Sequence, residues 1–332
     1  MSMTAPATVR RECLLCGAEC PRLYAGLRDR ICGTPGEYSI RECRACGMAW
    51  LDSAPLLEPH GEGYFTHTDD AGQLRNAVAP PTLVRATLAR RLGYAQPSAM
   101  RAAWLLERLP AWSEHCESYA LFLPANPTGR LLDVGCGNGV FAARMRLLGW
   151  DVTGIEPDAR TAAIARDVFG LNVHASTLED ANLPGACFDA ITLSHVIEHV
   201  PDPVGTLAEC RRLLRPGGTL IAATPNLRSL GRRTFGASWM HWDVPRHRYV
   251  FSPSSLSEVA RRAGLRTVEA RSSARAARWA WRRSRELRHD GMVVETNGGR
   301  ARGATAIAFG MVETLLTKVH DAGEECLLVA TA

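Results

Sequence analysis

Two cysteine pairs near the amino terminus have the spacing of a metal site. Cys13 and Cys16 stand in CLLCG, and Cys43 and Cys46 stand in CRACG. In each CxxC pair two thiolates can point at one ion, while the glycine lets backbone N–H groups turn toward the sulfurs. Four thiolates complete the tetrahedral shell of Zn²⁺, so the sequence predicts a structural zinc ribbon. Such a small segment has little core of its own, and the metal would supply its folding free energy.

A second group of chemistry-bearing residues is the run HVIEH at 195–199. If this run is helical, the i, i+3 and i+4 positions place His195, Glu198 and His199 on one face. His247, in a later PRH sequence, is a further candidate. Imidazoles with a carboxylate can hold a divalent ion, and a histidine near neutral pKa can accept a proton from a hydroxyl.

The third group is the stretch LLDVGCGNG at 131–139. Its apolar residues and Asp133 are typical of a short buried parallel strand, and Gly135, Gly137 and Gly139 then open a helix expected over 140–148. Glycine lacks a Cβ, so a ligand can touch the backbone, and the N–H groups of the first helical turn favour electron-rich ligand atoms. The stretch therefore predicts a nucleotide- or cofactor-binding turn.

Strands and helices alternate around this turn, which indicates an α/β domain with a doubly wound parallel sheet. We expect strands over 130–134, 151–155, 171–174, 188–193 and 219–223, helices over 159–169 and 204–214, and a tight turn at 215–218. Glu156 ends the second strand, where an acidic side chain is placed to accept hydrogen bonds from ribose hydroxyls.

The chain divides by pattern into three parts. We expect a zinc ribbon over 1–51, a helical connector or cofactor lid over 52–127, and the α/β domain over 128–332. Helical spacing in the connector predicts helices over 81–94 and 98–123.

Two segments of the α/β domain stand apart from the alternating pattern. Residues 227–252 are predicted to form a long polar and aromatic loop, of a length typical of a lid or a substrate wall, and Ser252 then caps a helix. Residues 270–302 are rich in arginine and predict an amphipathic helix, a glycine-rich break at 297–299 and a helix over 302–322. This tail is either a solvated face or a surface for an anionic partner.

The composition is that of a globular protein. Of the 332 residues 46% are hydrophobic and 22% charged, with a formal net charge of +5. The sequence has no run of 18 apolar residues, so no membrane span is expected, and its start lacks the apolar core of a secretory signal. The CxxC pairs among the 11 cysteines favour metal binding in a reducing compartment. We therefore expect a cytoplasmic protein, while the sequence does not indicate its oligomeric state.

Five motifs in this order resemble class I S-adenosylmethionine-dependent methyltransferases: LLDVGCGNG, GIEPD, FDAITLSHVIEHV, LLRPGGTLIAATPN and PRHRYVFSPSSL. Within that superfamily, residues 128–332 are similar to ubiquinone-biosynthesis O-methyltransferases and their bacterial relatives, several of which carry an N-terminal zinc ribbon. The resemblance implies a Rossmann-like seven-stranded sheet whose last strand is antiparallel, with 265–270 and 326–330 as strands six and seven.

The resemblance also implies which residues bind S-adenosylmethionine. The methionine and ribose part would be lined by Asp133, Gly135, Gly137 and Asn138, and the ribose diol would be held by Glu156. The adenine would be bordered by Pro157, Thr177 and Leu178, and the sulfonium end would face Ser194 and His195. A sulfonium and a neutral adenosine need no phosphate cradle, so GxGxG fits this ligand better than NAD.

The histidine run is interpreted within the same frame. HxxEH matches a zinc protease pattern, which we reject because the run follows a strand instead of lying within a long helix. It is closer to the ExxEH motif of metal-assisted O-methyltransferases, with His195 in place of the first acid and His247 as the later ligand. Histidine nitrogen suits Zn, Fe, Co or Ni better than Mg.

Three hypotheses for this group stay open. A catalytic divalent metal is held by His195, Glu198, His199 and His247; or His199 or His247 acts as a metal-free general base; or the side chains only shape the pocket while methyl transfer runs on proximity. His195 counts with the other two histidines as a catalytic candidate.

The expected function is methyl transfer from S-adenosylmethionine to a small-molecule or glycan acceptor, through a hydroxyl, as in sugar or secondary-metabolite biosynthesis. The acceptor class follows from the resemblance alone. The alternative is an RNA-modifying methyltransferase whose ribbon and arginine-rich tail bind nucleic acid, although no basic and aromatic cluster accompanies the cysteine pairs. A non-catalytic cofactor-binding scaffold is a further alternative, which the pocket histidines disfavour. An NAD-linked dehydrogenase is another; it predicts NADH binding, which calorimetry with S-adenosylhomocysteine and NADH would test.

Overall fold

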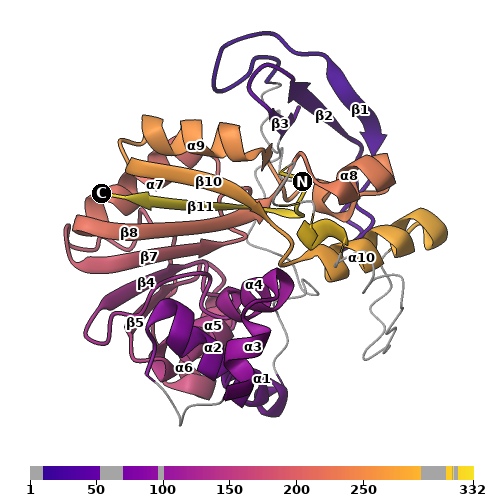
Figure 1. The fold of residues 1–332 in the computed structure, drawn as a ribbon. Helices are drawn as coiled ribbons and strands as arrows, with labels where there is room; N and C mark the ends of the chain where they lie inside the picture. The colour runs from indigo at the N-terminus through magenta and orange to yellow at the C-terminus, as the bar shows by residue number, and fades with distance from the viewer. Residues whose placement is uncertain (1–9, 53–69, 96–100, 293–311, 316, 318–320) are drawn as a thin grey trace.

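The computed structural model describes residues 10–52, 70–95, 101–292, 312–315, 317 and 321–332. A large sheet occupies the centre of the molecule, with connector helices on one side and a small antiparallel sheet beside α8 and α10 (Figure 1). Within these residues, no helix has the length and apolar character needed to cross a membrane.

The large sheet has seven strands in the order β10-β11-β8-β7-β4-β5-β6. Its strands are β4 (Arg130–Val134), β5 (Asp151–Ile155), β6 (Asn172–His174), β7 (Phe188–Ser194), β8 (Leu214–Pro225), β10 (Arg266–Ser273) and β11 (Glu325–Thr331). β11 runs antiparallel to both β8 and β10, and the other neighbours are parallel. The predicted seven-stranded methyltransferase sheet with an antiparallel last strand is confirmed.

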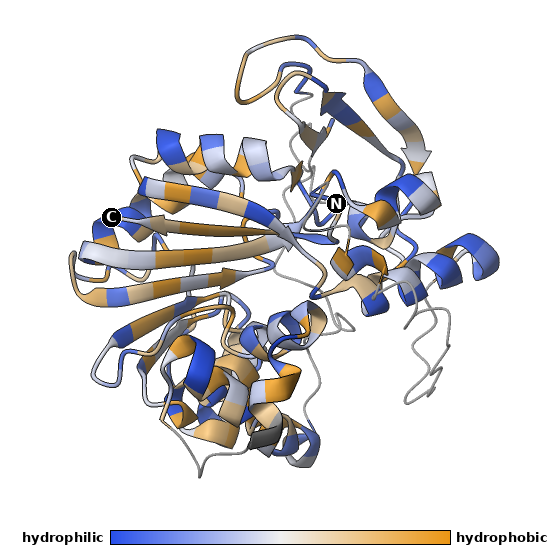
Figure 2. Cartoon of the chain, viewed as in Figure 1, coloured by the Kyte–Doolittle hydropathy of each residue, from blue (hydrophilic) through white to orange (hydrophobic). Residues whose placement is uncertain are grey.

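The crossover helices begin where local capping chemistry predicts. They are α5 (Val140–Leu147), α6 (Ala159–Phe169), α7 (Pro203–Leu213) and α9 (Pro253–Arg262). The carboxylate of Asp158 accepts from the Thr161 amide at 2.7 Å, and Ser252 forms a capping box with Ser255. Hydrophobic residues concentrate along the strands that these helices cover (Figure 2).

The separate turn expected at 215–218 is wrong. Leu214 already pairs with Phe188, so β8 begins before the two glycines, and a register shift between Phe188 and Ala190 accommodates them. Gly217 adopts a φ of 77°, which a residue with a side chain rarely takes.

The described part of the connector forms four short helices: α1 (Ala71–Val78), α2 (Thr82–Leu92), α3 (Arg101–Leu106) and α4 (Pro110–Ser118). The single helix expected over 98–123 is therefore wrong, and its first residues lie outside the described part of the chain. Pro110 lacks an N–H and clashes with the preceding turn, so it ends one helix and stands at the first turn of the next. α1 is tied to the large domain because Arg144 donates to the Ala77 and Val78 carbonyls at 2.7 and 3.0 Å.

The small sheet joins strands from distant parts of the sequence. Its order is β1 (Arg22–Leu27), β2 (Tyr38–Cys43), β3 (Met48–Leu51) and β9 (Tyr249–Phe251), all antiparallel. β9 belongs to the segment that the sequence predicted as a loop, so the cysteine-bearing module is completed by a strand of the large domain.

The prediction of one long loop over 227–252 is wrong for the same reason. The segment contains α8 (Leu230–Phe235), the 3₁₀ turns η1 (Gly236–Ser238) and η2 (Met240–Trp242), and β9. Its aromatic residues are core residues, since Trp239 is 1% exposed and Phe251 is fully buried. Burial of these side chains converts an apparent surface loop into ordered structure.

The amphipathic helix expected in the arginine-rich tail is α10 (Ala277–Asp290). Ala280, Ser284 and Leu287 form its buried face, and its outer face is hydrophilic (Figure 2). The break expected at 297–299 and most of the helix expected over 302–322 lie outside the described residues.

Candidate active site and cysteine cluster

The four cysteines of the two CxxC pairs come together in one cluster. Their thiol sulfurs all lie within 4.8 Å of one another, and Cys16 and Cys43 are 3.7 Å apart. Zn–S bonds of about 2.3 Å in a tetrahedron place two sulfurs about 3.8 Å apart. The Leu15 amide donates to Cys13 Sγ and the Cys46 amide to Cys43 Sγ, each at 3.4 Å. The donor set, its spacing and its backbone N–H partners fit Zn²⁺.

Metal removal is expected to unfold the small sheet, because thiolate–metal bonds supply much of its stability. Gently purified protein should hold one zinc per chain. Mild heating with a chelator should release the zinc and expose Trp50, a buried residue of β3, which tryptophan fluorescence reports. Cys16→Ser should lower the zinc content, while Cys32→Ser changes an exposed cysteine outside the cluster and should not. Absence of zinc, or equal loss in both variants, would contradict the assignment.

The glycine-rich turn adopts backbone conformations that demand glycine. Gly135, Gly137 and Gly139 all have positive φ, at 68°, 55° and 83°. A Cβ on Gly135 would lie 2.5 Å from a methyl group of Val196, so the turn passes close under the segment that follows β7. The glycines thus allow a tight turn at the carboxyl ends of the strands, which is where a cofactor is expected to bind.

Glu156 connects this turn to the end of β5. Its two oxygens accept from the Gly137 amide at 2.9 Å and the Asp158 amide at 3.0 Å. Burial raises the pKa of this carboxyl. Because β5 pairs in parallel with β4, the Glu156 carboxyl lies at the same edge of the sheet as the glycine-rich turn. A ribose diol would lie at this edge in the predicted complex.

The other predicted cofactor residues occupy the same edge at different depths. Asp133 is 3% exposed and accepts from the Thr192 hydroxyl at 2.8 Å; burial raises its pKa to about 7. Leu178 is buried, whereas Pro157 and Thr177 are exposed. Asn138 accepts weakly from the Val140 amide at 3.4 Å. Their contact with a cofactor remains a prediction.

The histidine run does not form a helix but a turn at the end of β7. His195 has a φ of 57°, and the His199 amide donates to the Val196 carbonyl at 2.9 Å. The turn still brings His195 Nδ1 within 3.0 Å of Glu198 Oε1. Because β7 adjoins β4 in the sheet, the run lies beside the glycine-rich turn.

Both ring nitrogens of His195 are engaged by carboxylates. Nδ1 faces Glu198, and Nε2 lies 2.6 Å from Glu325 Oε1. Burial lowers the pKa of His195, but the hydrogen bonds to these two carboxylates outweigh it and raise the pKa to about 9. A protonated imidazole has no lone pair to offer, so this environment disfavours His195 as a base or a metal ligand, and its predicted role stays a prediction.

Glu325 and Arg275 belong to this group, and sequence reasoning missed them. Arg275 donates to Glu325 Oε2 at 2.7 Å and to the Ser194 hydroxyl at 3.0 Å. Glu325 opens β11, whose antiparallel placement next to β8 brings it to the same edge as Ser194. The sequence signal was a pair of acidic residues before the last predicted strand.

A second subset, Glu198, His199 and His247, offers one ligand atom each within 4.8 Å of one another. His199 Nδ1 lies 3.1 Å from the Arg246 carbonyl, and His247 Nδ1 lies 2.7 Å from the His241 carbonyl. A carbonyl only accepts, so each Nδ1 carries a proton, and in the neutral form of each ring Nε2 is the nitrogen with the lone pair. Histidines fixed in this way serve as metal ligands or as bases.

Glu198 is the fully buried carboxylate of this subset. Burial alone would raise its pKa, but the hydrogen bond to His195 and the charges of the nearby histidines lower it to about 2. Its other oxygen accepts from the Thr224 hydroxyl at 2.8 Å. The structure thus groups three of the four predicted second-site residues, while His195 contacts Glu198 without belonging to that group.

Comparison with known proteins identifies the class of the large domain. Residues 106–270 match a family model described as a methyltransferase domain. Together, the seven-stranded sheet, the glycine-rich turn and this match define an S-adenosylmethionine-dependent methyltransferase domain.

The domain is related to ubiquinone biosynthesis O-methyltransferases. The Cereibacter sphaeroides protein of that name is 35% identical over 165 residues, covering 46% of this chain and 66% of the relative. The Aromatoleum aromaticum protein is 38% identical over 152 residues, covering 42% and 65%. The chain therefore spans slightly less than two thirds of the length of these relatives.

A solved structure shows a more distant likeness. It is a Thermotoga maritima protein described as an S-adenosylmethionine-dependent methyltransferase, possible histamine N-methyltransferase, with 21% identity and a TM-score of 0.44. The match covers 75% of this chain and 98% of that one. A likeness of this degree does not indicate the acceptor.

Proposed function

We propose that this protein transfers a methyl group from S-adenosylmethionine to a hydroxyl of a small-molecule or glycan acceptor. The observation that carries the proposal is the pair of imidazoles, His199 and His247, whose Nδ1 protons are fixed by carbonyl oxygens. One ring nitrogen of each histidine and one Glu198 oxygen lie within 4.8 Å of one another beside the end of β7, next to the glycine-rich turn. A hydroxyl that accepts a methyl group must lose its proton, and this group can take or stabilise it.

The donor side of the site consists of the glycine-rich turn and Glu156. S-adenosylmethionine, when bound, supplies an electrophilic methyl group on a sulfonium. Glu156 holds the ribose hydroxyls, Gly135 and Gly137 admit the ligand to the backbone, and Ser194 borders the sulfonium end. The connector helices cover this side, since α1 is fixed to α5 through Arg144 and α4 contacts the segment after β10 through Glu114.

The acceptor side consists of Glu198, His199 and His247. In one arrangement, His199 or His247 accepts the hydroxyl proton at Nε2 as a general base. In the other, the three side chains hold a divalent ion that lowers the pKa of the hydroxyl. One carboxylate with two imidazoles favours Zn, Fe, Co or Ni over Mg, which prefers oxygen ligands. The cationic His195 orients Glu198 in both arrangements.

A hydroxyl acceptor is favoured because the relatives are O-methyltransferases, and methyl transfer to oxygen is the reaction that needs such a base. An RNA acceptor is less favoured. In α10, Arg282 and Arg283 face Glu286 at 3.8 and 3.0 Å, so part of its basic surface is neutralised. Nucleic acid that copurifies with the protein, with a steep salt dependence of binding, would support RNA instead.

The test has a binding step and a transfer step. Calorimetry should show binding of S-adenosylhomocysteine and no binding of NADH. Incubation with methyl-labelled S-adenosylmethionine and a panel of sugars, glycosides and phenols should then label one class of hydroxyl compound. Binding of NADH in place of S-adenosylhomocysteine would overturn the donor assignment, and label on nitrogen or carbon alone would overturn the hydroxyl acceptor.

A further inference from the structure

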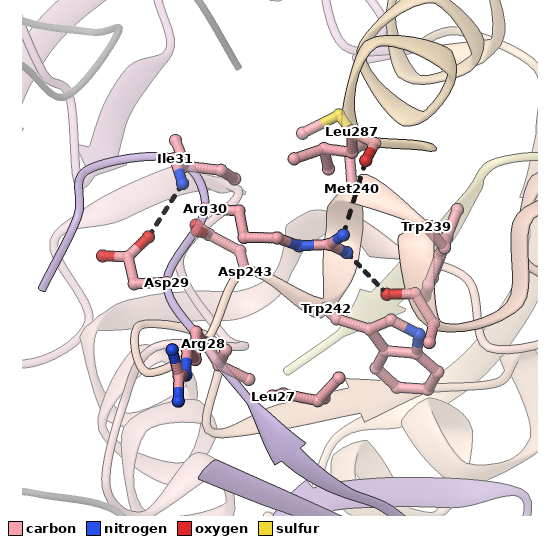
Figure 3. A pocket seen from close by; sticks show the side chains of 12 residues that line it. Leu27, Arg28, Asp29, Arg30, Ile31, Trp239, Met240, Trp242, Asp243 and Leu287 are labelled. Atoms are coloured by element: carbon pink, nitrogen blue, oxygen red, sulfur yellow. Dashed lines mark hydrogen bonds between the residues drawn. The ribbon is translucent and has the colours of Figure 1, made fainter. Parts of the chain in front are cut away.

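Residues 10–52, which carry the four clustered cysteines and strands β1 to β3, are called the cysteine module here. The loop between β1 and β2 of this module contacts the large domain. It presents Asp29 and Arg30 to residues 237–246, the segment that leads to His247 (Figure 3). The cavity between the two parts is only about 20 Å³, room for a single water. The module therefore packs directly on the chain that carries part of the candidate active site.

Asp29 is oriented by its own loop before it meets the large domain. Its carboxylate oxygens accept from the amides of Ile31, Cys32 and Thr34 at 2.9 to 3.0 Å. The side chain is fully buried. Burial raises the pKa of this carboxyl, but the hydrogen bonds, first that from Arg246, lower it well below its usual range. The carboxylate is thus a fixed anion in a dry interface.

Arg246 is the partner that this anion holds. Two guanidinium nitrogens of Arg246 lie 2.6 and 2.9 Å from the Asp29 oxygens, and Arg246 also contacts Asp243. A bidentate guanidinium–carboxylate pair fixes direction as well as distance. Because Arg246 is 6% exposed, water cannot replace Asp29 as its partner.

Arg246 then passes this constraint to the histidines. Its carbonyl oxygen accepts from His199 Nδ1 at 3.1 Å, and its neighbour in sequence is His247. The amides of Arg246 and His247 both donate to the Asp243 carbonyl, at 2.8 and 3.0 Å. One short turn, held from outside by Asp29, therefore sets the position of both imidazoles.

Arg30 holds the same segment at its other end. Its guanidinium donates to the Ala237 carbonyl at 2.8 Å and to the Leu287 carbonyl of α10 at 3.4 Å, as the dashed lines in Figure 3 show. Pairing of β3 with β9 continues the contact on the far side of His247. The cysteine module thus contacts the segment around His247 at three places: Asp29 binds Arg246, Arg30 binds Ala237, and β3 pairs with β9.

We propose that Asp29 is a positioning residue: through Arg246 it fixes the imidazoles of His199 and His247 in the acceptor site. This inference rests on the proposed function for its catalytic meaning, but the coupling itself does not require methyl transfer. The cysteine module then stabilises the position of the two histidines on the acceptor side, and the metal stabilises the fold of the module.

The test compares zinc-loaded full chains of the wild type, Asp29→Asn and Arg28→Gln. Arg28 lies in the same loop and forms an exposed pair with Glu37, so it is the matched control. Imidazole ¹⁵N–¹H spectra, with signals assigned from His199→Asn and His247→Asn, report the tautomer and surroundings of the two histidines. Calorimetry with S-adenosylhomocysteine reports the donor site.

Asp29→Asn should shift or broaden the His199 and His247 signals, while S-adenosylhomocysteine affinity stays within about twofold of wild type. Asp29→Glu should bring the signals back toward wild type, and Arg28→Gln should leave them unchanged. If Asp29→Asn does not fold, Arg246→Lys replaces it in the test, because lysine keeps the charge but loses the bidentate geometry. Arg246→Lys should then shift or broaden the His199 and His247 signals.

Wild-type imidazole signals in Asp29→Asn, or equal shifts in Arg28→Gln, would overturn the proposal. A parallel loss of S-adenosylhomocysteine binding would overturn it as well, because the effect would then be general. Coupled signals in a protein that methylates no hydroxyl compound would reject the proposed function and leave this coupling standing.

Discussion

His199→Asn should lower kcat for methyl transfer by about 10²- to 10⁴-fold, the usual contribution of a positioned general base. The asparagine amide nitrogen can replace Nδ1 as donor to the Arg246 carbonyl, so the change removes mainly the Nε2 lone pair. His247→Asn should act in the same way through the His241 carbonyl. Steady-state rates with the acceptor found by the labelling screen measure both variants.

The matched control is His289→Asn, which changes an exposed histidine at the end of α10 and should leave kcat unchanged. Wild-type turnover in both His199→Asn and His247→Asn would contradict the base and the metal hypotheses together. Methyl transfer would then depend on proximity alone, with the imidazoles shaping the pocket.

Metal and base catalysis predict different patterns across the same variants. A metal site needs all of its ligands, so Glu198→Gln should cost as much as either histidine change, and a chelator should abolish turnover until metal is restored. A base needs one histidine, resists chelation, and gives a rate that rises with pH as that imidazole loses its proton. His195 is the less favoured base, since its hydrogen bonds to Glu198 and Glu325 raise its pKa to about 9.

Local sequence patterns were sufficient to bring the glycine-rich turn and Glu156 together. The glycine-rich turn and Glu156 each follow directly after a strand, and parallel strands end at a common edge, so their meeting needs only the order of elements. Each CxxC pair could likewise be predicted locally, because four consecutive residues are enough to place two sulfurs beside one ion.

The acceptor side could not be predicted in the same way, because its contacts join residues distant in sequence. Glu325 reaches His195 only because β11 inserts between β8 and β10, and Asp29 reaches Arg246 only because β9 joins the small sheet. Pattern reasoning also assigned the aromatic residues of 227–252 to a surface, since it cannot tell a lid from a core. The helical arrangement considered for the run at 195–199 is wrong, because His195 adopts a positive φ and the run forms a turn.

Glu156→Gln should weaken the binding of both S-adenosylmethionine and S-adenosylhomocysteine by about 10- to 100-fold. A hydrogen bond to a charged group contributes about 1.5 to 3 kcal/mol, and the ribose is common to the two ligands. Calorimetry measures both affinities. Glu179→Gln, a change of an exposed acid on the loop that follows β6, is the control and should bind as wild type does.

The fold of the Glu156→Gln variant should survive the loss of the charge. Burial raises the pKa of Glu156, so the folded state disfavours its carboxylate form. The protonated group therefore stabilises the fold below its unfolded pKa. This contribution is lost as the pH rises through the folded pKa. A neutral amide removes that penalty at neutral pH, although it gives up one acceptor for the Gly137 or Asp158 amide. We expect a thermal midpoint within a few degrees of wild type. Unchanged affinity for both ligands would contradict the ribose assignment, whereas a large drop in the midpoint would show that Glu156 holds the turn together instead of the cofactor.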